Sequence, residues 1–312
     1  MADKRATRQG LYHGLVELGK KHPEILAVDA DLAQTTGAYE FYKVFPERYI
    51  NCGIAEQNLI GMSAGLARVG FVPFCSSMAV FAIGRGFEII RNSVAYAKLN
   101  VKVVGSHGGI TAAGDGGTHQ AIEDFSAMKG IPEMAILSPC DYNQAFLLAK
   151  LAYEYDGPMY IRTSREPTEN ITTQEDVIEL GKAQELRTGD DLCIVATGMM
   201  SVLATRAATA LSEKGVEATI LNIHTLKPFD SDAIIAAARS CGGRVLVCEE
   251  ANIIGGLGES VARALVEEDG IIFGQVGVND RFGQSGLTEE LLEAYGITSE
   301  NIERNALALM QR

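Results

Sequence analysis

The sequence predicts an α/β protein of two domains, each with a mainly parallel sheet covered by helices. The chain has 312 residues, about twice the usual length of one domain. Short apolar runs without alternation recur between stretches of helical period, which is typical of parallel sheets buried on both faces. An acidic, threonine-rich stretch separates these runs into a longer and a shorter set, as expected of a linker between domains.

The first domain is predicted over residues 1–168, where four runs indicate buried strands. They are ILAVDADL at 25–32, VKVVGSH at 101–107, EMAILSP at 133–139 and PMYIRTS at 158–164. Helical period predicts a helix from Thr7 and another over 86–98, with Phe87, Ile90 and Val94 on one face. This alternation of strands and helices predicts a parallel sheet between helical layers.

The second, smaller domain is predicted over residues 190–312, after a linker at 169–189. The linker lies in EPTENITTQEDVIELGKAQELRTGD, where apolar residues are isolated. Strands are then predicted at DLCIVATG (191–198), ATILNIHTLKPFD (218–230), RVLVCEE (244–250) and IIFGQVGV (271–278). Helical stretches between them predict a second α/β unit.

Charge and composition exclude several classes of protein. The formal net charge of −13 argues against binding of a nucleic-acid backbone, which needs a basic surface. No window has the roughly 18 apolar residues of a membrane span, and MADKRATRQG lacks the apolar core of a signal peptide. We therefore expect a cytoplasmic protein without a membrane partner. The six cysteines form no C-x-x-C pair, so neither a disulfide framework nor a metal site is expected.

The glycine-rich segment HGGITAAGDGGTH at 107–119 is the first candidate site. It follows a predicted buried strand and carries His107, Asp115 and His119. Ligands of open α/β sheets bind at the carboxyl ends of the strands, and imidazoles are the side chains that exchange protons near neutral pH. The alternative is an ordinary mobile loop with two exposed histidines. The three polar residues together favour a site.

Two further segments carry charged candidates. Glu56 in NCGIAEQN opens a predicted helix, where it could either act chemically or simply complement the helix dipole. Arg162 and Arg165 close a strand in RTSRE and suit a phosphate group, although a surface ion pair with Glu166 or another carboxylate is equally compatible. A lone GDG at 114–116 without G-x-G-x-x-G disfavours a nicotinamide dehydrogenase.

In combination, these segments resemble the carboxyl-terminal half of transketolases. The motifs occur in the family's order: ERYINCGIAEQN (47–58), SSMAVFAIGRGFEIIRNS (76–93), HGGITAAGDGGTHQAIED (107–124) and YIRTSRE (160–166). KPFD, CEEANIIGGLGES and DRFGQSG then resemble the family's third domain, so the similarity spans nearly the whole chain. Gly114 and Gly117 depart from the pattern, since larger members commonly carry glutamate and proline there.

The resemblance implies a thiamine diphosphate pyrimidine-binding domain followed by a transketolase carboxyl-terminal domain. The family's diphosphate-binding domain, with GDG and a later asparagine pair, has no counterpart: only Asn143 lies at the required distance from Gly114. The chain thus resembles one subunit of a split transketolase. A partner subunit with the GDG…NN motif is expected to bind most of the diphosphate and Mg²⁺, in an α2β2 heterotetramer, while this chain itself holds no metal.

The resemblance also implies roles for individual residues. Those expected to act in catalysis are Glu56, which activates the cofactor by a hydrogen bond to its pyrimidine, and His107 and His119. The cofactor is expected to contact Glu56, Phe81, Asp31 and Ile54, with Phe87 as the alternative to Phe81 for stacking on the pyrimidine. Residues expected to bind the sugar phosphate are Asp115, His107, Arg165, Ser164, Arg8 and Thr35.

The implied reaction is transfer of a two-carbon ketol unit between ketose and aldose phosphates through a thiamine diphosphate adduct, as in the pentose phosphate pathway. Two alternatives stay open: the β subunit of a 2-oxoacid dehydrogenase E1 component, and a non-catalytic scaffold subunit. The THQ and SRE segments favour a sugar-phosphate substrate over a 2-oxoacid. The identity of the sugars, including modified ones, stays open.

Overall fold

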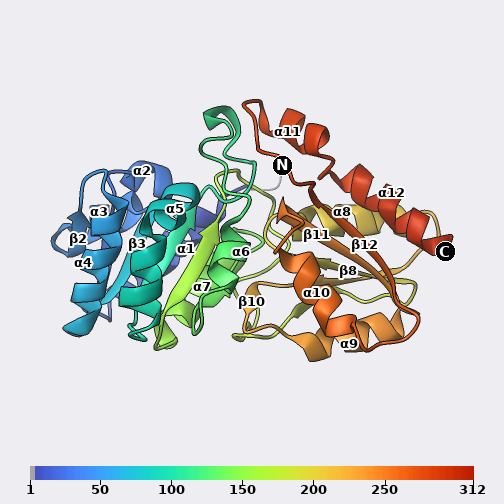
Figure 1. The fold of residues 1–312 in the computed structure, drawn as a ribbon, viewed down its shortest axis with the longest axis horizontal. Helices are drawn as coiled ribbons and strands as arrows, with labels where there is room; N and C mark the ends of the chain where they lie inside the picture. Colours follow the sequence, from blue (N-terminus) through green and yellow to red (C-terminus); the bar gives the residue numbers. More distant parts are fainter. Residues whose placement is uncertain (1–3) are drawn as a thin grey trace.

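The structure is a computed structural model that describes residues 4–312. Its helices and strands form two α/β domains that lie side by side (Figure 1). One contains a seven-stranded sheet and the other a five-stranded sheet. The two-domain α/β class predicted from the sequence is therefore confirmed.

The larger sheet has the strand order β10-β5-β6-β4-β3-β1-β2. Its strands are β1 (Ile25–Asp29), β2 (Tyr49–Asn51), β3 (Val72–Met78), β4 (Lys102–Ser106), β5 (Ala135–Leu137), β6 (Met159–Thr163) and β10 (Thr225–Lys227). All neighbours pair in parallel except β10 with β5. The carboxyl ends of β1 to β6 consequently share one edge of the sheet.

Helices cover both faces of this sheet, because successive side chains of a strand point to opposite faces. The helices of this domain are α1 (Thr7–Gly19), α2 (Ala33–Thr36), α3 (Tyr39–Val44), α4 (Glu56–Arg68), α5 (Ala79–Ile89), α6 (Asp124–Lys129) and α7 (Tyr142–Glu154). The core beneath α1, α3 and α7 includes Ala27 of β1, whereas the core beneath α4, α5 and α6 includes Val28. The unbroken apolar runs reflect this two-sided burial.

The smaller sheet has the order β12-β11-β8-β9-β7. Its strands are β7 (Gln184–Arg187), β8 (Leu192–Ala196), β9 (Ala218–Asn222), β11 (Arg244–Asn252) and β12 (Ile272–Val278). The helices are α8 (Met200–Ser212), α9 (Ser231–Ser240), α10 (Leu257–Leu265), α11 (Thr288–Tyr295) and α12 (Ser299–Met310). One core lies under α8, α11 and α12, and the other under α9 and α10.

Three elements differ from the sequence prediction. The run at 218–230 divides: β9 stays in the smaller sheet, whereas β10 pairs antiparallel with β5 and so joins the larger one. Within the predicted linker, Gln184–Arg187 forms β7 and pairs with β9. The helix α5 begins earlier than predicted and continues as a π-helix over Ile90–Ala95, which leaves Phe87 exposed while Ile90 and Val94 are buried. The π-turn changes the register of the buried face.

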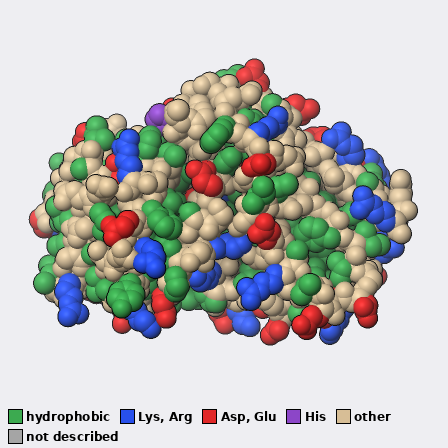
Figure 2. All heavy atoms as spheres, viewed as in Figure 1, with side chains coloured by type: hydrophobic (Ala, Val, Ile, Leu, Met, Phe, Trp, Pro, Cys, Tyr) green, Lys and Arg blue, Asp and Glu red, His purple; other side chains and the backbone are tan. Residues whose placement is uncertain are grey.

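No helix among residues 4–312 is long and apolar enough to cross a membrane. On the face shown in Figure 2, lysine and arginine side chains are interspersed with aspartate and glutamate. The basic groups on this face do not form one continuous field of the kind that binds a polyanion.

Candidate active site

The candidate residues lie after the carboxyl ends of five strands that are neighbours in the larger sheet. Asp31 and Thr35 follow β1, Ile54 and Glu56 follow β2, Phe81 follows β3, His107 follows β4, and Ser164 and Arg165 follow β6. Because these strands run in parallel, their carboxyl ends bring all of these segments to one edge. This is the edge at which ligands bind in open α/β sheets.

His107 is the most deeply buried histidine of this edge, with 2% of its surface exposed. Its backbone adopts the left-handed conformation (φ 62°) directly after β4, and its Nδ1 lies 2.8 Å from Ser106 Oγ. Burial, reinforced by the positive charges of Arg8 and Arg165, lowers the pKa of His107 to about 3. His107 is therefore neutral at neutral pH, and its bond to Ser106 leaves Nε2 as the nitrogen that a ligand would meet.

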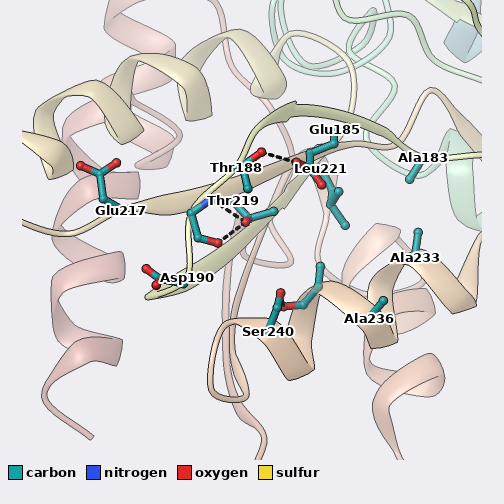
Figure 3. A pocket seen from close by; sticks show the side chains of 12 residues that line it. Ala183, Glu185, Thr188, Asp190, Glu217, Thr219, Leu221, Ala233, Ala236 and Ser240 are labelled. Carbon is teal, nitrogen blue, oxygen red and sulfur yellow. Dashed lines mark hydrogen bonds between the residues drawn. The ribbon is translucent and has the colours of Figure 1, made fainter.

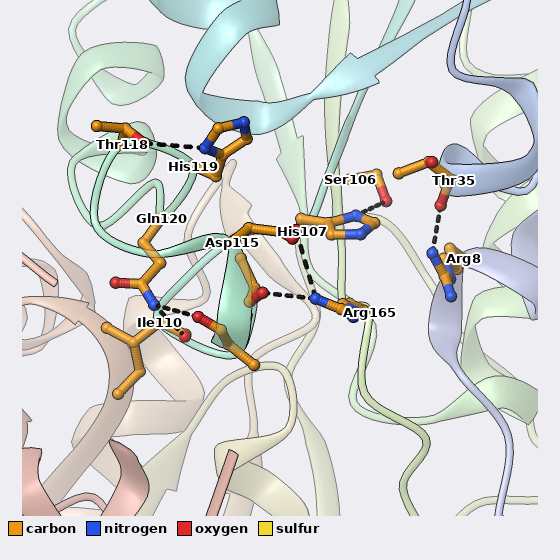
Figure 4. A network of polar contacts seen from close by, with 12 residues as sticks. Arg8, Thr35, Ser106, His107, Ile110, Asp115, Thr118, His119, Gln120 and Arg165 are labelled. Carbon is orange, nitrogen blue, oxygen red and sulfur yellow. Dashed lines mark hydrogen bonds and ion pairs between the residues drawn. The ribbon is translucent and has the colours of Figure 1, made fainter. Parts of the chain in front are cut away.

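His119 closes the glycine-rich loop and lies against Phe81. The two rings meet edge to face, with centroids 5.1 Å apart. Thr118 Oγ1 lies 2.9 Å from His119 Nδ1 and orients the imidazole (Figure 4). The loop thus brings one histidine to the aromatic ring that follows β3.

Glu56 is the first residue of α4 and only 2% exposed. Its Oε2 accepts a hydrogen bond from Arg85 Nη1 at 2.9 Å, and the Arg85 guanidinium also lies over the Phe81 ring, 4.5 Å from its centroid. The guanidinium is a flat, nitrogen-containing group. The space between the carboxyl group and the ring therefore accepts a flat group that bonds to Glu56 and stacks on Phe81.

Phe87, the alternative to Phe81, lies elsewhere on α5. It is 37% exposed and lines a shallow apolar groove with Val80 and Ala127. Phe81 is the one of the two that contacts His119 and Arg85.

Two arginines approach the loop from different elements. Arg165 Nη1 donates to Ala112 O at 2.6 Å and lies 3.3 Å from Asp115 Oδ2. Arg8 donates to the backbone oxygen of Thr35. Burial and then the charge of Arg165 lower the pKa of Arg8. Two like charges held close together form a region suited to a multiply charged anion (Figure 4).

The start of α1 is attached to the end of β6, which places Arg8 near Arg165. Arg5 and Thr168 exchange backbone hydrogen bonds at 3.1 and 3.2 Å. Thr7 Oγ1 accepts a hydrogen bond from Ser164 N at 2.7 Å and lies 2.9 Å from Ser164 Oγ. Ser164 therefore holds the amino end of α1 in the structure.

Asp29, the last residue of β1, binds the segment that follows the strand. This buried carboxylate accepts hydrogen bonds from Thr36 Oγ1 and Ser76 Oγ, both at 3.0 Å. Asp31 adopts the left-handed conformation (φ 64°) and accepts a hydrogen bond from Asn51 Nδ2 at 2.8 Å. The turn thereby links the ends of β1 and β2. Ile54 follows β2 and is 75% exposed.

The sequence prediction was wrong for Arg162 and missed Arg85. Arg162 is neither a phosphate ligand nor part of a surface ion pair, because it is buried and its Nε lies 3.2 Å from Asp124 Oδ2. Arg165 pairs with Asp115, so the carboxylate it meets in this structure is one other than Glu166, as the sequence left open. Arg85 lies four residues after Phe81 on the same helix, a spacing that brings side chains together and could have revealed it.

The largest hollow described lies away from this edge. It has a volume of ≈ 810 Å³ and lies between β7, β9 and α9 of the smaller domain (Figure 3). Its lining includes the carboxylates of Glu185, Asp190 and Glu217 together with several alanines and Leu221. None of the candidate residues lines it. Within residues 4–312, no group of three or more histidine, cysteine, aspartate or glutamate side chains is arranged to hold a metal ion.

Comparison with known proteins identifies the class to which this fold and site belong. Residues 3–169 match the family model described as "Transketolase, pyrimidine binding domain", and residues 181–302 match "Transketolase, C-terminal domain". Both are parts of thiamine-dependent enzymes, and they follow one another here as in that class. The chain belongs to the transketolase family, which implies dependence on thiamine diphosphate.

Individual relatives include both subunits and longer chains. The 6-deoxy-6-sulfo-D-fructose transketolase subunit SqwH of Clostridium sp. (strain MSTE9) is 43% identical over 298 residues, which are 96% of this chain and 92% of that protein. Human transketolase is 33% identical over 315 residues and aligns with the whole chain, which spans only 50% of the human protein.

A solved structure described as "Split gene transketolase, inactive beta4 tetramer" has the same fold. It is 42% identical, covers 99% of both chains and superposes with a TM-score of 0.88. The resemblance to a split transketolase inferred from the sequence is thereby confirmed.

Proposed function

We propose that this chain is the carboxyl-terminal subunit of a two-chain transketolase. With a partner subunit that carries the diphosphate-binding domain, it transfers a two-carbon ketol unit between ketose and aldose phosphates. The observation that carries the proposal is the end-to-end similarity to a split-gene transketolase chain, combined with the gathering of the candidate residues at one sheet edge.

The partner subunit completes the enzyme in this proposal. The chain matches the SqwH subunit and the split-gene chain over nearly all of their own length, which supports assigning the other half of a transketolase to a second chain. That chain holds the diphosphate and Mg²⁺ through its GDG…NN motif. Two copies of each subunit give the simplest assembly, an α2β2 heterotetramer. The inactive β4 tetramer of the similar structure supports the expectation that this subunit is inactive alone.

The residues present fit the pyrimidine of thiamine diphosphate. The groups that would contact it are the buried carboxyl group of Glu56, the aromatic ring of Phe81 and the exposed apolar side chain of Ile54. The flat guanidinium group of Arg85 already lies between Glu56 and Phe81. When bound, the cofactor supplies a nucleophilic carbon that cleaves and forms the bond next to a sugar carbonyl. Asp31, which follows β1, would contact the other ring of the cofactor.

Glu56 acts on the cofactor through a hydrogen bond to the pyrimidine ring nitrogen. A buried carboxyl group at the amino end of a helix can hold that bond in a dry site, where it is stronger than in water. Phe81 stacks on the ring and excludes water from it. For this to occur, Arg85 gives up its place between Glu56 and Phe81 to the pyrimidine.

The loop residues bind the reacting end of the sugar. His107 is neutral, so its Nε2 can accept or donate a hydrogen bond to a hydroxyl group without the cost of discharging a buried cation. His119 stabilises the oxygen on which charge develops. Asp115 accepts a hydrogen bond from a donor hydroxyl and so selects its configuration.

The distal phosphate of the sugar is bound by Arg165 and Arg8, with Ser164 and Thr35 at the same end of the site. Mutual repulsion of two close guanidinium groups is relieved when a dianion binds between them. Binding energy from this remote group orients the sugar carbonyl at the reacting centre.

The proposal is tested by reconstitution. The partner is isolated by pull-down with this chain, identified by a GDG…NN motif, and the pair is assayed with xylulose 5-phosphate and ribose 5-phosphate in the presence of thiamine diphosphate and Mg²⁺. Two-carbon transfer by the pair and none by this chain alone is expected. Activity of this chain alone would overturn the two-chain reading. Oxidative decarboxylation of pyruvate onto a lipoyl carrier would instead support the E1 alternative, and an inactive pair would support a scaffold.

A further inference from the structure

The glycine-rich loop has a second face, which is buried in the carboxyl-terminal domain. Ile110 and Ala113 of the loop, and Ile122 just beyond it, belong to the hydrophobic core formed mainly by β8, β9, β11, β12 and the helices packed on them. Ile110 is fully buried there. The loop is thus part of the larger domain by sequence but part of the smaller domain's core by packing.

Glu250 of β11 binds the loop directly. Its Oε1 accepts a hydrogen bond from Thr111 N at 2.8 Å, although the two residues are 139 positions apart. Gly109 has a φ of +85°, and a Cβ atom there would lie 2.3 Å from the Glu250 carboxyl group. The backbone can approach the carboxylate this closely only because it carries no side chain at this position.

Arg162 fixes the base of the loop to the same strand. Its Nη2 donates to the backbone oxygens of Glu250, at 2.7 Å, and of Ala121, at 3.3 Å. Since Ala121 also accepts a hydrogen bond from Gly109 N at 2.7 Å, the two ends of the loop meet at this guanidinium. The ion pair with Asp124 neutralises the buried cation.

Gln120 binds the far side of the loop to the segment after β12. Its Nε2 donates to Ile110 O and to Gln284 O, both at 2.9 Å (Figure 4). Gly283 lies so close that a Cβ atom would be 1.5 Å from Gln120 Oε1, and one at Gly117 would be 2.5 Å from Gly283 O. A side chain larger than hydrogen at either glycine would therefore push this segment and the loop apart.

We propose that Glu250 is a positioning residue, through which the carboxyl-terminal domain sets the placement of loop 107–120 and hence of His107 and Asp115. The placement of the loop stands on the contacts above, whereas its consequence for turnover rests on the proposed function. The segment 283–285 acts on the same loop from its other side. The smaller domain thereby determines substrate binding without contributing a side chain that touches the substrate.

The adjacent Glu249 provides a matched control. It is a buried carboxylate on the same strand that also accepts backbone hydrogen bonds, from Leu257 N at 2.7 Å and Gly258 N at 2.9 Å. These bonds hold the start of α10, on the face of the sheet that faces away from the loop. Replacing either glutamate removes the same chemical group, but only Glu250 binds the loop.

The first test is hydrogen exchange of the full chain. Glu250→Ala leaves Thr111 N buried without an acceptor, so amides of residues 108–113 are expected to exchange roughly ten- to a hundredfold faster. Glu250→Gln keeps an oxygen acceptor and is expected to restore most of the protection. Glu249→Ala is expected to expose α10 and leave 108–113 unchanged. Unchanged exchange in folded Glu250→Ala, or equal exchange in the two alanine variants, overturns the proposal.

A second variant perturbs the loop from the segment after β12. Gly283→Ala adds a methyl group against Gln120 in a partly exposed segment. It is expected to increase exchange of the loop by severalfold; no change overturns the role of this segment.

In the reconstituted enzyme, Glu250→Ala is expected to raise KM for the donor sugar by roughly tenfold or more with a smaller change in kcat, because it disorders binding groups rather than the cofactor. Glu250→Gln is expected to restore KM, which a general loss of stability would not allow. If hydrogen exchange of the loop responds to Glu250 but the reconstituted pair has no transfer activity, the proposed function is refuted and the positioning role of Glu250 stands. If Glu250→Ala has the wild-type KM, the positioning role of Glu250 is refuted.

Discussion

Two isoleucines show how the two halves of the candidate site differ. Ile110, in the loop that carries His107 and Asp115, is fully buried in the core of the smaller domain. Ile54, which precedes Glu56, is 75% exposed. The half proposed to bind the sugar is held by contacts within the chain, whereas the half proposed to bind the pyrimidine exposes the apolar side chain of Ile54. If the proposed second chain covers Ile54, the first half is preorganised within this chain and the other half is completed on assembly.

The largest expected effect concerns the half proposed to face the second chain. Glu56→Gln, measured in the reconstituted enzyme, is expected to lower kcat by about 10²–10⁴-fold, because a carboxyl group can pass a proton to the ring nitrogen along this hydrogen bond whereas an amide can only donate the bond. The variant should still bind the partner, because the side chain is buried in this chain and pairs with Arg85. Steady-state transfer assays measure kcat, and size-exclusion chromatography measures binding of the partner.

Glu88→Gln on α5 serves as the control for Glu56→Gln, since it removes an exposed carboxylate that lies outside the site. It is expected to leave turnover unchanged. Near-normal turnover of Glu56→Gln would show that Glu56 does not activate the cofactor. The proposed difference between the two halves of the site would then lose its main support.

The second effect concerns the preorganised half. Arg165→Ala is expected to raise KM for a sugar phosphate by roughly 10- to 100-fold, as expected for loss of a hydrogen bond to a charged group. The effect should be much smaller for a donor without a phosphate. Arg206→Ala, which removes a surface ion pair with Glu169, is the control and should change neither value. An equal rise of KM for both donors would show that Arg165 shapes the loop through Ala112 and Asp115 instead.

A third effect is a pH dependence of folding. The pKa of His107 is lowered to about 3 by burial, from an ordinary value of 6.5, so the unfolded chain binds a proton that the folded chain does not. The free energy of unfolding therefore decreases as pH falls below 6.5, by at most about 1.4 kcal/mol per pH unit for this group. Above pH 6.5 the group contributes no slope.

Urea unfolding of wild type and His107→Gln between pH 6.5 and about pH 5 measures this slope. His224, whose pKa burial lowers to about 4, contributes in the same direction and remains in the variant. The variant should therefore have a smaller slope, not a zero slope. Identical slopes would mean that His107 is protonated in the folded chain, which would contradict its assignment as a neutral hydrogen-bonding group.

Local patterns predicted the parts of the fold that local physics determines. The buried runs became β1, β4, β5 and β6 because two-sided burial requires apolar residues at successive positions. Glu56 was correctly predicted to open a helix. The strand β10 was not foreseen, since nothing in a three-residue run indicates that it leaves its own sheet to pair with β5.

The residues that hold the site were harder to predict than those proposed to form it. Glu249 and Glu250 are adjacent and chemically identical, and only the orientation of β11 determines which one meets the loop. Their contacts span long sequence separations. The order of the motifs was enough to propose His107 and Asp115 as site residues. The contact of Glu250 with their loop could be found only from the packing of one domain on the other.

The smallest expected effect is that of Ile54→Ala on the stability of the chain, and it is compared with the same substitution at Ile110. Ile54→Ala removes a side chain that is already largely in water, so the free energy of unfolding of this chain alone should change by less than about 0.5 kcal/mol. The same substitution at Ile110 empties part of a core and should cost about 2–5 kcal/mol. Thermal and urea unfolding of the two variants measure this difference directly.

In the reconstituted pair, Ile54→Ala should weaken retention of thiamine diphosphate, measured by equilibrium dialysis. If Ile54→Ala instead destabilised this chain as much as Ile110→Ala, the pyrimidine-binding half would be as closed as the sugar-binding half. The need for a second chain would then have to be sought elsewhere in the molecule.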